Sequence, residues 1–223
     1  MWSSENSAFR DSPESGLAWC KAENLLGDLP ALLQQVGVRG MFPTGDSSVP
    51  VSSSQIVDLP SLQVFLKSYL GEILVPLEFP VIAEACSRVG HGETRELIAL
   101  DQRVSNEARL APFAAASHKI GAMQLQRLKP LRGERTVRRY LDAVESGQAE
   151  GWHTLVYGLT LAVYSFPLRQ GLLHYGRETL SGLARAAAGP KKFLKPACQE
   201  MLEPILGCLP EAIEKTLVNC ARD

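Results

Sequence analysis

The sequence contains few of the patterns that usually indicate chemistry. Its 223 residues include no Gly-x-Ser-x-Gly, Gly-x-Gly-x-x-Gly or P-loop motif, which removes the usual signals of acyl transfer, dinucleotide binding and nucleotide hydrolysis. The five cysteines are odd in number, widely spaced and without a Cys-x-x-Cys pair. A disulfide framework or a structural zinc site is therefore not expected, and reduced thiols in a cytoplasm are the better interpretation.

Long apolar runs are also missing. The longest nearly apolar stretch, residues 155–166, is shorter than the roughly 20 residues that a membrane-spanning helix needs. The N-terminus has no basic stretch followed by an apolar one, so a secretory signal is not expected. The net charge of −1 gives no basic excess of the kind that nucleic-acid binding requires. We expect a cytoplasmic protein that binds neither a membrane nor nucleic acid.

The titratable residues form no catalytic or metal-binding pattern. No two of the four histidines have the i, i+4 spacing that places two imidazoles on one face of a helix. His118 and His153 are expected near helix surfaces, and Glu93, Glu96 and Asp101 on the solvated face of an amphipathic helix. No catalytic residue, metal ligand or cofactor site is predicted.

Helical periodicity is what the chain does contain. Asp58 is a predicted N-cap, and a helix from there is expected to end at Pro76. Residues 153–164 are apolar nearly all round, as in a central helix, and no alternating strand appears. The fold class predicted is all-α, a single-domain bundle of about eight to ten helices. The other helices are expected at 29–38, 78–89, 93–106, 110–128, 136–146, 167–188, 194–206 and 210–221.

The domain organisation follows from composition. Residues 1–28 are polar and are interrupted by Pro13 and Gly16, so they are expected to form a flexible N-terminal segment. Residues 29–223 are expected to form the helical domain, with residues 189–223 as its C-terminal tail.

Two motifs in a fixed order point to a family. Phe42-Pro43-Thr44-Gly45 comes first, and Glu107-x-Arg109 follows, leading into a helix with Ser117 and Gly121 on its small-residue face. Together with the helical segments after them, these motifs resemble the urease accessory proteins of the UreF family over about residues 29–205. The chain departs from the family pattern in residues 46–54 and around residues 189–193, and is therefore identified as a divergent member.

The resemblance implies a non-enzymatic chaperone of urease maturation. Such a protein forms a homodimer, bridges a UreD/UreH-type accessory protein and the UreG-type GTPase, and assists nickel insertion into the urease apoprotein. GTP and nickel chemistry would belong to the GTPase, so no cofactor is expected here. The candidate partner-binding residues are Phe42, Pro43, Thr44, Gly45, Glu107, Arg109, Ser117, Gly121, Lys191, Lys192 and Lys195.

Each candidate also has a purely structural interpretation. The motif at residues 42–45 is typical of a tight turn with Phe42 buried, and the small-residue face is typical of helix packing. Glu107 and Arg109 could form a local ion pair, which is worth little when exposed. The lysines near residue 192 are typical of a solvated turn, or could complement an acidic partner.

Two other functions stay open at this point. One is an all-α enzyme with a small-molecule pocket between helices, lined for instance by His153, Tyr157 and His174. A pocket lined by these residues would favour it, and a solid apolar core would count against it. The other is a helical adaptor on the same fold that has lost its urease role, because the segment after Gly45 is altered.

Overall fold

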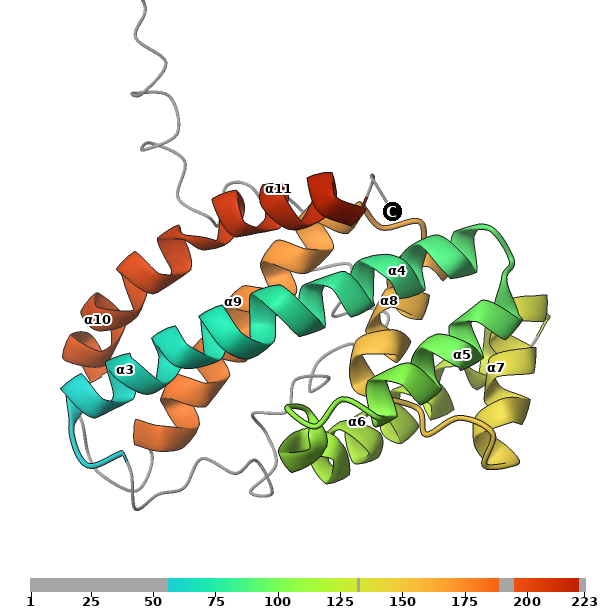
Figure 1. The fold of residues 1–223 in the computed structure, drawn as a ribbon, viewed down its shortest axis with the longest axis horizontal. Helices are drawn as coiled ribbons and strands as arrows, with labels where there is room; N and C mark the ends of the chain where they lie inside the picture. Colours follow the sequence, from blue (N-terminus) through green and yellow to red (C-terminus); the bar gives the residue numbers. More distant parts are fainter. Residues whose placement is uncertain (1–55, 132, 189–194, 221–223) are drawn as a thin grey trace, which may run out of the picture.

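The structure is a computed structural model that describes residues 56–131, 133–188 and 195–220. These residues form helices and no strand, so the all-α prediction is confirmed (Figure 1). The predicted N-terminal segment, the predicted helix at 29–38, the motif at 42–45 and the pair Lys191 and Lys192 lie outside the described residues.

The helices follow one another with short connections. The α-helices are α3 (Leu59–Tyr69), α4 (Phe79–Gly90), α5 (Thr94–Ser105), α6 (Ala114–Leu128), α7 (Arg135–Glu145), α8 (His153–Val163), α9 (Leu168–Ala188), α10 (Lys195–Gly207) and α11 (Leu209–Cys220). A π-helix and two 3₁₀ turns complete the described chain: η2 (Leu70–Glu78), η3 (Ala111–Phe113) and η4 (Lys129–Leu131).

The first helix begins at the predicted cap. The Asp58 carboxylate accepts a hydrogen bond from the Ser61 amide at 2.9 Å, and the Ser61 hydroxyl accepts one from the Asp58 amide at 3.0 Å. This reciprocal capping box satisfies two amides that have no partner within the helix. The prediction that Asp58 is the N-cap is confirmed.

The prediction that Pro76 ends this helix is wrong. The chain stays helical through η2 and enters α4 without a break, so α3, η2 and α4 form one long rod across the molecule (Figure 1). Proline lacks an N–H, and in an α-helix its ring clashes with the carbonyl four residues earlier. The wider π turn, with its i→i+5 bonds, accommodates the ring at Pro76 and lets the helix continue.

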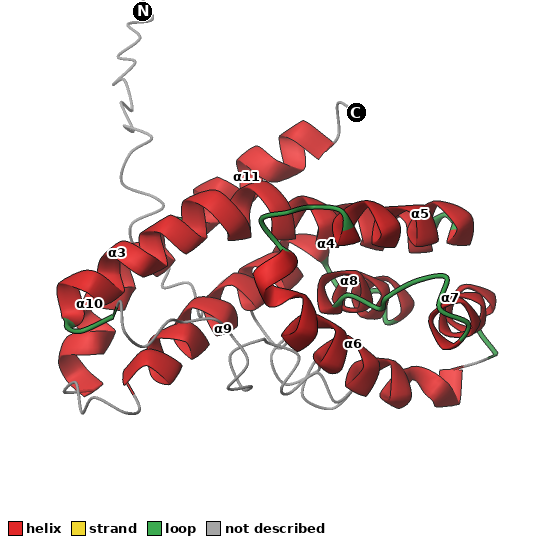
Figure 2. Ribbon diagram, turned by 60° about the horizontal axis from the view of Figure 1, so that its bottom comes forward, coloured by secondary structure: helices red, strands yellow, loops and turns green. Residues whose placement is uncertain are grey.

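The centre of the bundle is α8. It packs against α4 on one side and α6 on the other, and residues 153–161 are all buried, which confirms the predicted central helix. Gly158 permits this packing, because a Cβ there would lie 2.7 Å from the Ile82 carbonyl oxygen of α4. Around this centre, α5, α6 and α7 gather at one end of the molecule, while α3 and α10 lie at the other (Figures 1 and 2).

The predicted tail contributes two of the packed helices. α10 packs against α9 and α3, and α11 packs against α4 and α9. Their buried side chains belong to the same apolar core as those of α8: Cys198, Leu202, Ile205, Leu206, Leu209 and Ile213. Deleting residues 189–223 would therefore remove core side chains in addition to any surface.

Candidate partner-binding site

A buried carboxylate ties the α7–α8 connection to α5. The Asp101 side chain has no exposed surface, and its oxygens accept hydrogen bonds from the Tyr140 hydroxyl at 2.6 Å and from the Glu150 amide at 2.7 Å. The amides of Gly151 and Trp152 also donate to it, at 3.1 and 3.4 Å. Four donors, one hydroxyl and three backbone amides, therefore converge on this one side chain and hold the connection in place.

The expectation that Asp101 belongs to a solvated face is therefore wrong. It lies four residues after Leu97 and three before Val104, both of which are buried. These spacings put its side chain on the apolar face of α5. An acid at such a position is the sequence signal that could have identified this anchor.

The anchored connection is pressed against α6 at two predicted residues. A Cβ at Gly121 would lie 1.8 Å from the Gly151 carbonyl oxygen, so only glycine fits there. The Ser117 hydroxyl oxygen accepts a hydrogen bond from the His153 amide at 3.1 Å and lies 2.6 Å from His153 Nδ1. Both predicted residues are buried and contact other parts of this chain. Their role in partner binding stays a prediction.

His153 lies in the core, so the expectation that it sits near a helix surface is wrong. It is 2% exposed, and burial lowers its pKa to about 3. The ring is therefore neutral, and its Nε2 lies 2.6 Å from the Tyr175 hydroxyl. Although Ser117 and His153 are in contact, both are closed off from solvent. This pair cannot reach a substrate and is not a nucleophilic site.

Glu107 and Arg109 form the predicted ion pair in the turn between α5 and η3. Arg109 Nε lies 2.9 Å from Glu107 Oε1, and the Arg109 amide donates to the same oxygen at 3.2 Å. These hydrogen bonds lower the pKa of the Glu107 carboxyl. Because the Arg109 side chain is 55% exposed, solvent screens the pair, and it contributes little to stability.

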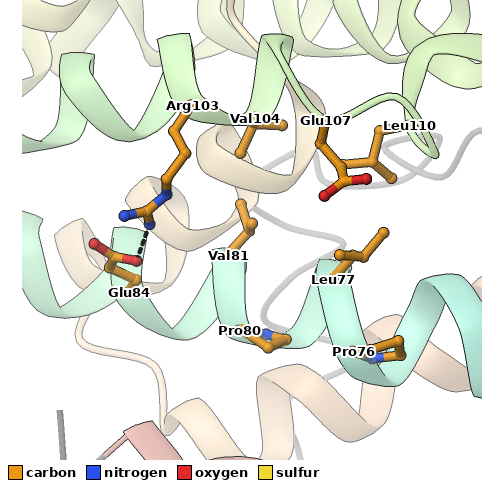
Figure 3. Close-up of a pocket in the computed structure, with 9 residues that line it drawn as sticks. All are labelled: Pro76, Leu77, Pro80, Val81, Glu84, Arg103, Val104, Glu107 and Leu110. Atoms are coloured by element: carbon orange, nitrogen blue, oxygen red, sulfur yellow. Dashed lines mark hydrogen bonds and ion pairs between the residues drawn. The ribbon is translucent and has the colours of Figure 1, made fainter.

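Glu107 also stands at the rim of a groove. The groove has a volume of about 210 Å³ and lies between the η2–α4 part of the rod and the end of α5. In Figure 3, Leu77 and Val81 of the rod point toward Val104 and Leu110 on the other side, and the Glu84–Arg103 ion pair closes one end. The lining residues are Pro76, Leu77, Pro80, Val81, Glu84, Arg103, Val104, Glu107 and Leu110.

Sequence reasoning identified one of these nine residues. Pro76 and Leu77 were missed because a helix ending at Pro76 would separate them from the face of α4. The other six were missed because local spacing does not show which helices pack against each other. Pro76 and Pro80 are four residues apart, a spacing that places them on one side of a continuous helix. Two prolines at this spacing between apolar residues were the available signal.

The remaining predicted residues are placed as follows. Lys195 is the first residue of α10. Of the residues proposed to line an enzyme pocket, Tyr157 is fully buried and donates its hydroxyl to the Gly171 carbonyl at 3.0 Å, and His174 is half-buried. None of these residues lines the groove.

The part of the chain that the structure describes contains neither a metal-binding group nor a membrane-spanning helix. Among them, no three His, Cys, Asp or Glu side chains are grouped as a metal ion would require. No helix in the described ranges combines the length and the apolar character that crossing a membrane demands.

The comparisons with known proteins add one positive result. A search of curated proteins found no match. The model of the protein family described as UreF matches residues 56–188, which span the rod, the groove, the Asp101 anchor and the central helix. This match covers more than half of the chain and agrees with the resemblance seen in the motifs. The chain belongs to the UreF family of urease accessory proteins.

Proposed function

We propose that this chain is a non-enzymatic scaffold for urease maturation in the cytoplasm. As a homodimer, it holds a UreD/UreH-type accessory protein and the UreG-type GTPase together, so that nickel can be inserted into the urease apoprotein. The observation that carries the proposal is the family match over residues 56–188. We assign partner contact to the groove between the rod and α5, and retain the other predicted partner residues as candidates.

The surface and core of the described chain support a binding role. The groove has an apolar floor and a rim of paired charges, Glu84 with Arg103 and Glu107 with Arg109. Interfaces commonly combine an apolar centre with a polar rim. Beneath the groove, the core is packed with apolar side chains from every α-helix of the described part.

The alternative of an enzyme receives no support from a specific observation. His153 and Tyr157, which were suggested as pocket residues, are packed in the core. The alternative of an adaptor without a urease role has the same fold, so an experiment must separate it from the scaffold.

The experiment is co-expression of the chain with its host's UreD-type and UreG-type proteins. Affinity capture followed by size-exclusion chromatography with light scattering measures which complex forms. We expect a stable complex that contains two copies of this chain. If a correctly folded chain captures neither partner, the scaffold proposal is wrong and the adaptor is favoured.

A matched pair of variants tests the groove itself. Val81→Arg places a charge on the groove floor, whereas Val218→Arg makes the same change on α11, where Val218 is 50% exposed outside the groove. We expect Val81→Arg to weaken capture at least tenfold and Val218→Arg to leave it unchanged. Circular dichroism confirms that both variants are folded. Equal capture by the two variants would show that the groove does not contact a partner.

A further inference from the structure

The rod contains a buried acid at the junction of η2 and α4. Glu78 is 2% exposed, and its Oε1 accepts a hydrogen bond from the Tyr69 hydroxyl at 2.9 Å. Its Oε2 is buried and has no hydrogen-bond partner among the described residues. A buried carboxylate with an unsatisfied oxygen is costly, because charge leaves water without full compensation.

Glu78 is the end of a chain of polar groups through the core. The Tyr175 hydroxyl also acts on its carboxyl and partly offsets the effect of burial. That hydroxyl lies 2.6 Å from His153 Nε2, and His153 Nδ1 lies 2.6 Å from the Ser117 hydroxyl. Together with Tyr69, these polar groups come from five elements: α3, η2, α9, α8 and α6.

The direction of these hydrogen bonds follows from the Glu78 end. The Tyr175 hydroxyl lowers the pKa of Glu78, as a donor to its carboxyl does. Because the single Tyr175 hydrogen is used there, the Tyr175 oxygen accepts from Nε2–H of the neutral His153 ring. His153 Nδ1 then carries no hydrogen and accepts from the Ser117 hydroxyl. The two hydroxyls nearest to Glu78, Tyr69 and Tyr175, therefore both donate to its carboxyl.

We propose that Glu78 makes the junction of η2 and α4 a proton-sensitive joint. The joint is held firmly when the carboxyl carries a proton, and it loosens when the proton is lost and a negative charge remains in the core. Pro76, Leu77, Pro80 and Val81, which flank Glu78 in sequence, line the groove. A change at the joint therefore reaches the groove. The proposal concerns the folded chain alone and does not depend on the proposed function.

Among the described residues, hydroxyls rather than charged groups lie closest to the Glu78 carboxyl. The titratable groups that face it are Tyr69 and Tyr175, with the neutral His153 behind Tyr175. The other titratable and charged groups of η2 and the surrounding elements are exposed or half-buried, and none acts on its pKa: Lys67, Glu72, Glu84, Arg88, His174, Arg169, Arg177, Glu178, Arg185, Glu211, Glu214 and Lys215.

The direction of the pH effect follows from this environment. Burial raises the pKa of Glu78 from 4.5 to about 7, and the two tyrosine hydroxyls lower it by a smaller amount. The folded chain therefore binds this proton more tightly than the unfolded chain does. Stability contributed by the protonated form is complete below about pH 4.5 and is lost as pH rises through about 7.

The test is thermal unfolding of the full chain between pH 5 and pH 8. We expect the wild-type Tm to fall by about 5–10 °C over this range. Glu78→Gln should remove most of that fall, because the amide is neutral and keeps an oxygen that accepts from Tyr69. The control Glu72→Gln changes an exposed acid of the same π-helix and should keep the wild-type slope.

If Glu78→Gln does not fold, a second variant and a second measurement still test the proposal. Tyr69→Phe removes a donor that lowers the Glu78 pKa, so the midpoint of the pH transition should move upward. Amide hydrogen exchange of residues 70–79, corrected for intrinsic rates, should accelerate across the same transition. An unchanged slope in Glu78→Gln, an unmoved midpoint in Tyr69→Phe, or exchange that does not follow the transition would each overturn the proposal.

Discussion

Two buried carboxylates, Asp101 and Glu78, stand in different surroundings. Asp101 of α5 is fully buried and accepts hydrogen bonds from one hydroxyl and three backbone amides. Glu78 is buried almost as completely, yet one of its oxygens has no partner in the described part of the chain. The donors, rather than the depth of burial, distinguish them. The well-satisfied carboxylate of Asp101 fixes a connection between two parts of the chain, whereas burial raises the pKa of the poorly satisfied Glu78.

The largest effect is expected at the satisfied carboxylate. Asp101→Asn places an amide group among donors that need acceptors, so we expect a loss of about 3–5 kcal/mol in the free energy of unfolding. Denaturant unfolding at pH 7 measures it. Asp142→Asn makes the same change on the exposed face of α7 and should cost less than about 0.5 kcal/mol. Similar costs for the two variants would contradict the comparison.

The next prediction concerns the rigidity of the α7–α8 connection that Asp101 holds. Gly121→Ala would bring a Cβ against the Gly151 carbonyl oxygen, and we expect a loss of about 1–3 kcal/mol. Gly90→Ala provides the control, because nothing lies within 4 Å of a Cβ at that position. If the two variants have equal melting temperatures, the connection moves freely and is not fixed.

A smaller effect is expected at Ser117, the group farthest from Glu78 in this series of hydrogen bonds. Ser117→Ala leaves the His153 amide and Nδ1 without their partner, which should cost about 1–2 kcal/mol. The fall of Tm with pH should persist, because Glu78 keeps both tyrosine hydroxyls. Thermal unfolding at pH 5 and pH 8 measures both quantities, with the exposed Ser68→Ala as control. Loss of the pH dependence in Ser117→Ala would show that the hydrogen-bonded groups from Ser117 to Glu78 titrate together.

The smallest effect is expected at the groove rim, where charges are paired in solvent. Arg103→Gln removes one partner of Glu84, which keeps its contact with Arg88 at 3.4 Å. Because the Arg103 side chain is 64% exposed, the change should cost less than about 1 kcal/mol. Chemical unfolding at low and high salt measures it. A cost of several kcal/mol would mean that this exposed pair contributes as much to the free energy of unfolding as the buried carboxylates do.

The helices were largely predictable from the sequence, because apolar spacing and caps act locally. Asp58 with Ser61 and the all-round apolar α8 show this directly. The errors concern residues whose roles depend on distant parts of the chain. Asp101 finds its partners 39 to 51 positions away, and no local pattern reveals such donors.

The candidate site was less predictable for the same reason. Gly121 was assigned to a close-packing face, which the contact with Gly151 bears out, but the segment that packs there could not be named in advance. The groove depends on a helix continuing through Pro76, and a π turn is not encoded by apolar spacing. Glu107 was found through its motif, and its place at the rim emerged from the fold.

The π-helical segment makes the length of the rod as constrained as its composition. In an α-helix each residue turns the chain by about 100°, and in the wider π turn somewhat less. One residue inserted or deleted within residues 70–78 would therefore rotate α3 relative to α4 by roughly a quarter of a turn. Leu62 and Leu66, both fully buried, would then swing away from the core that Phe79 and Ile82 share with them. In relatives of this protein, length changes between Asp58 and Gly90 should therefore be rarer than substitutions.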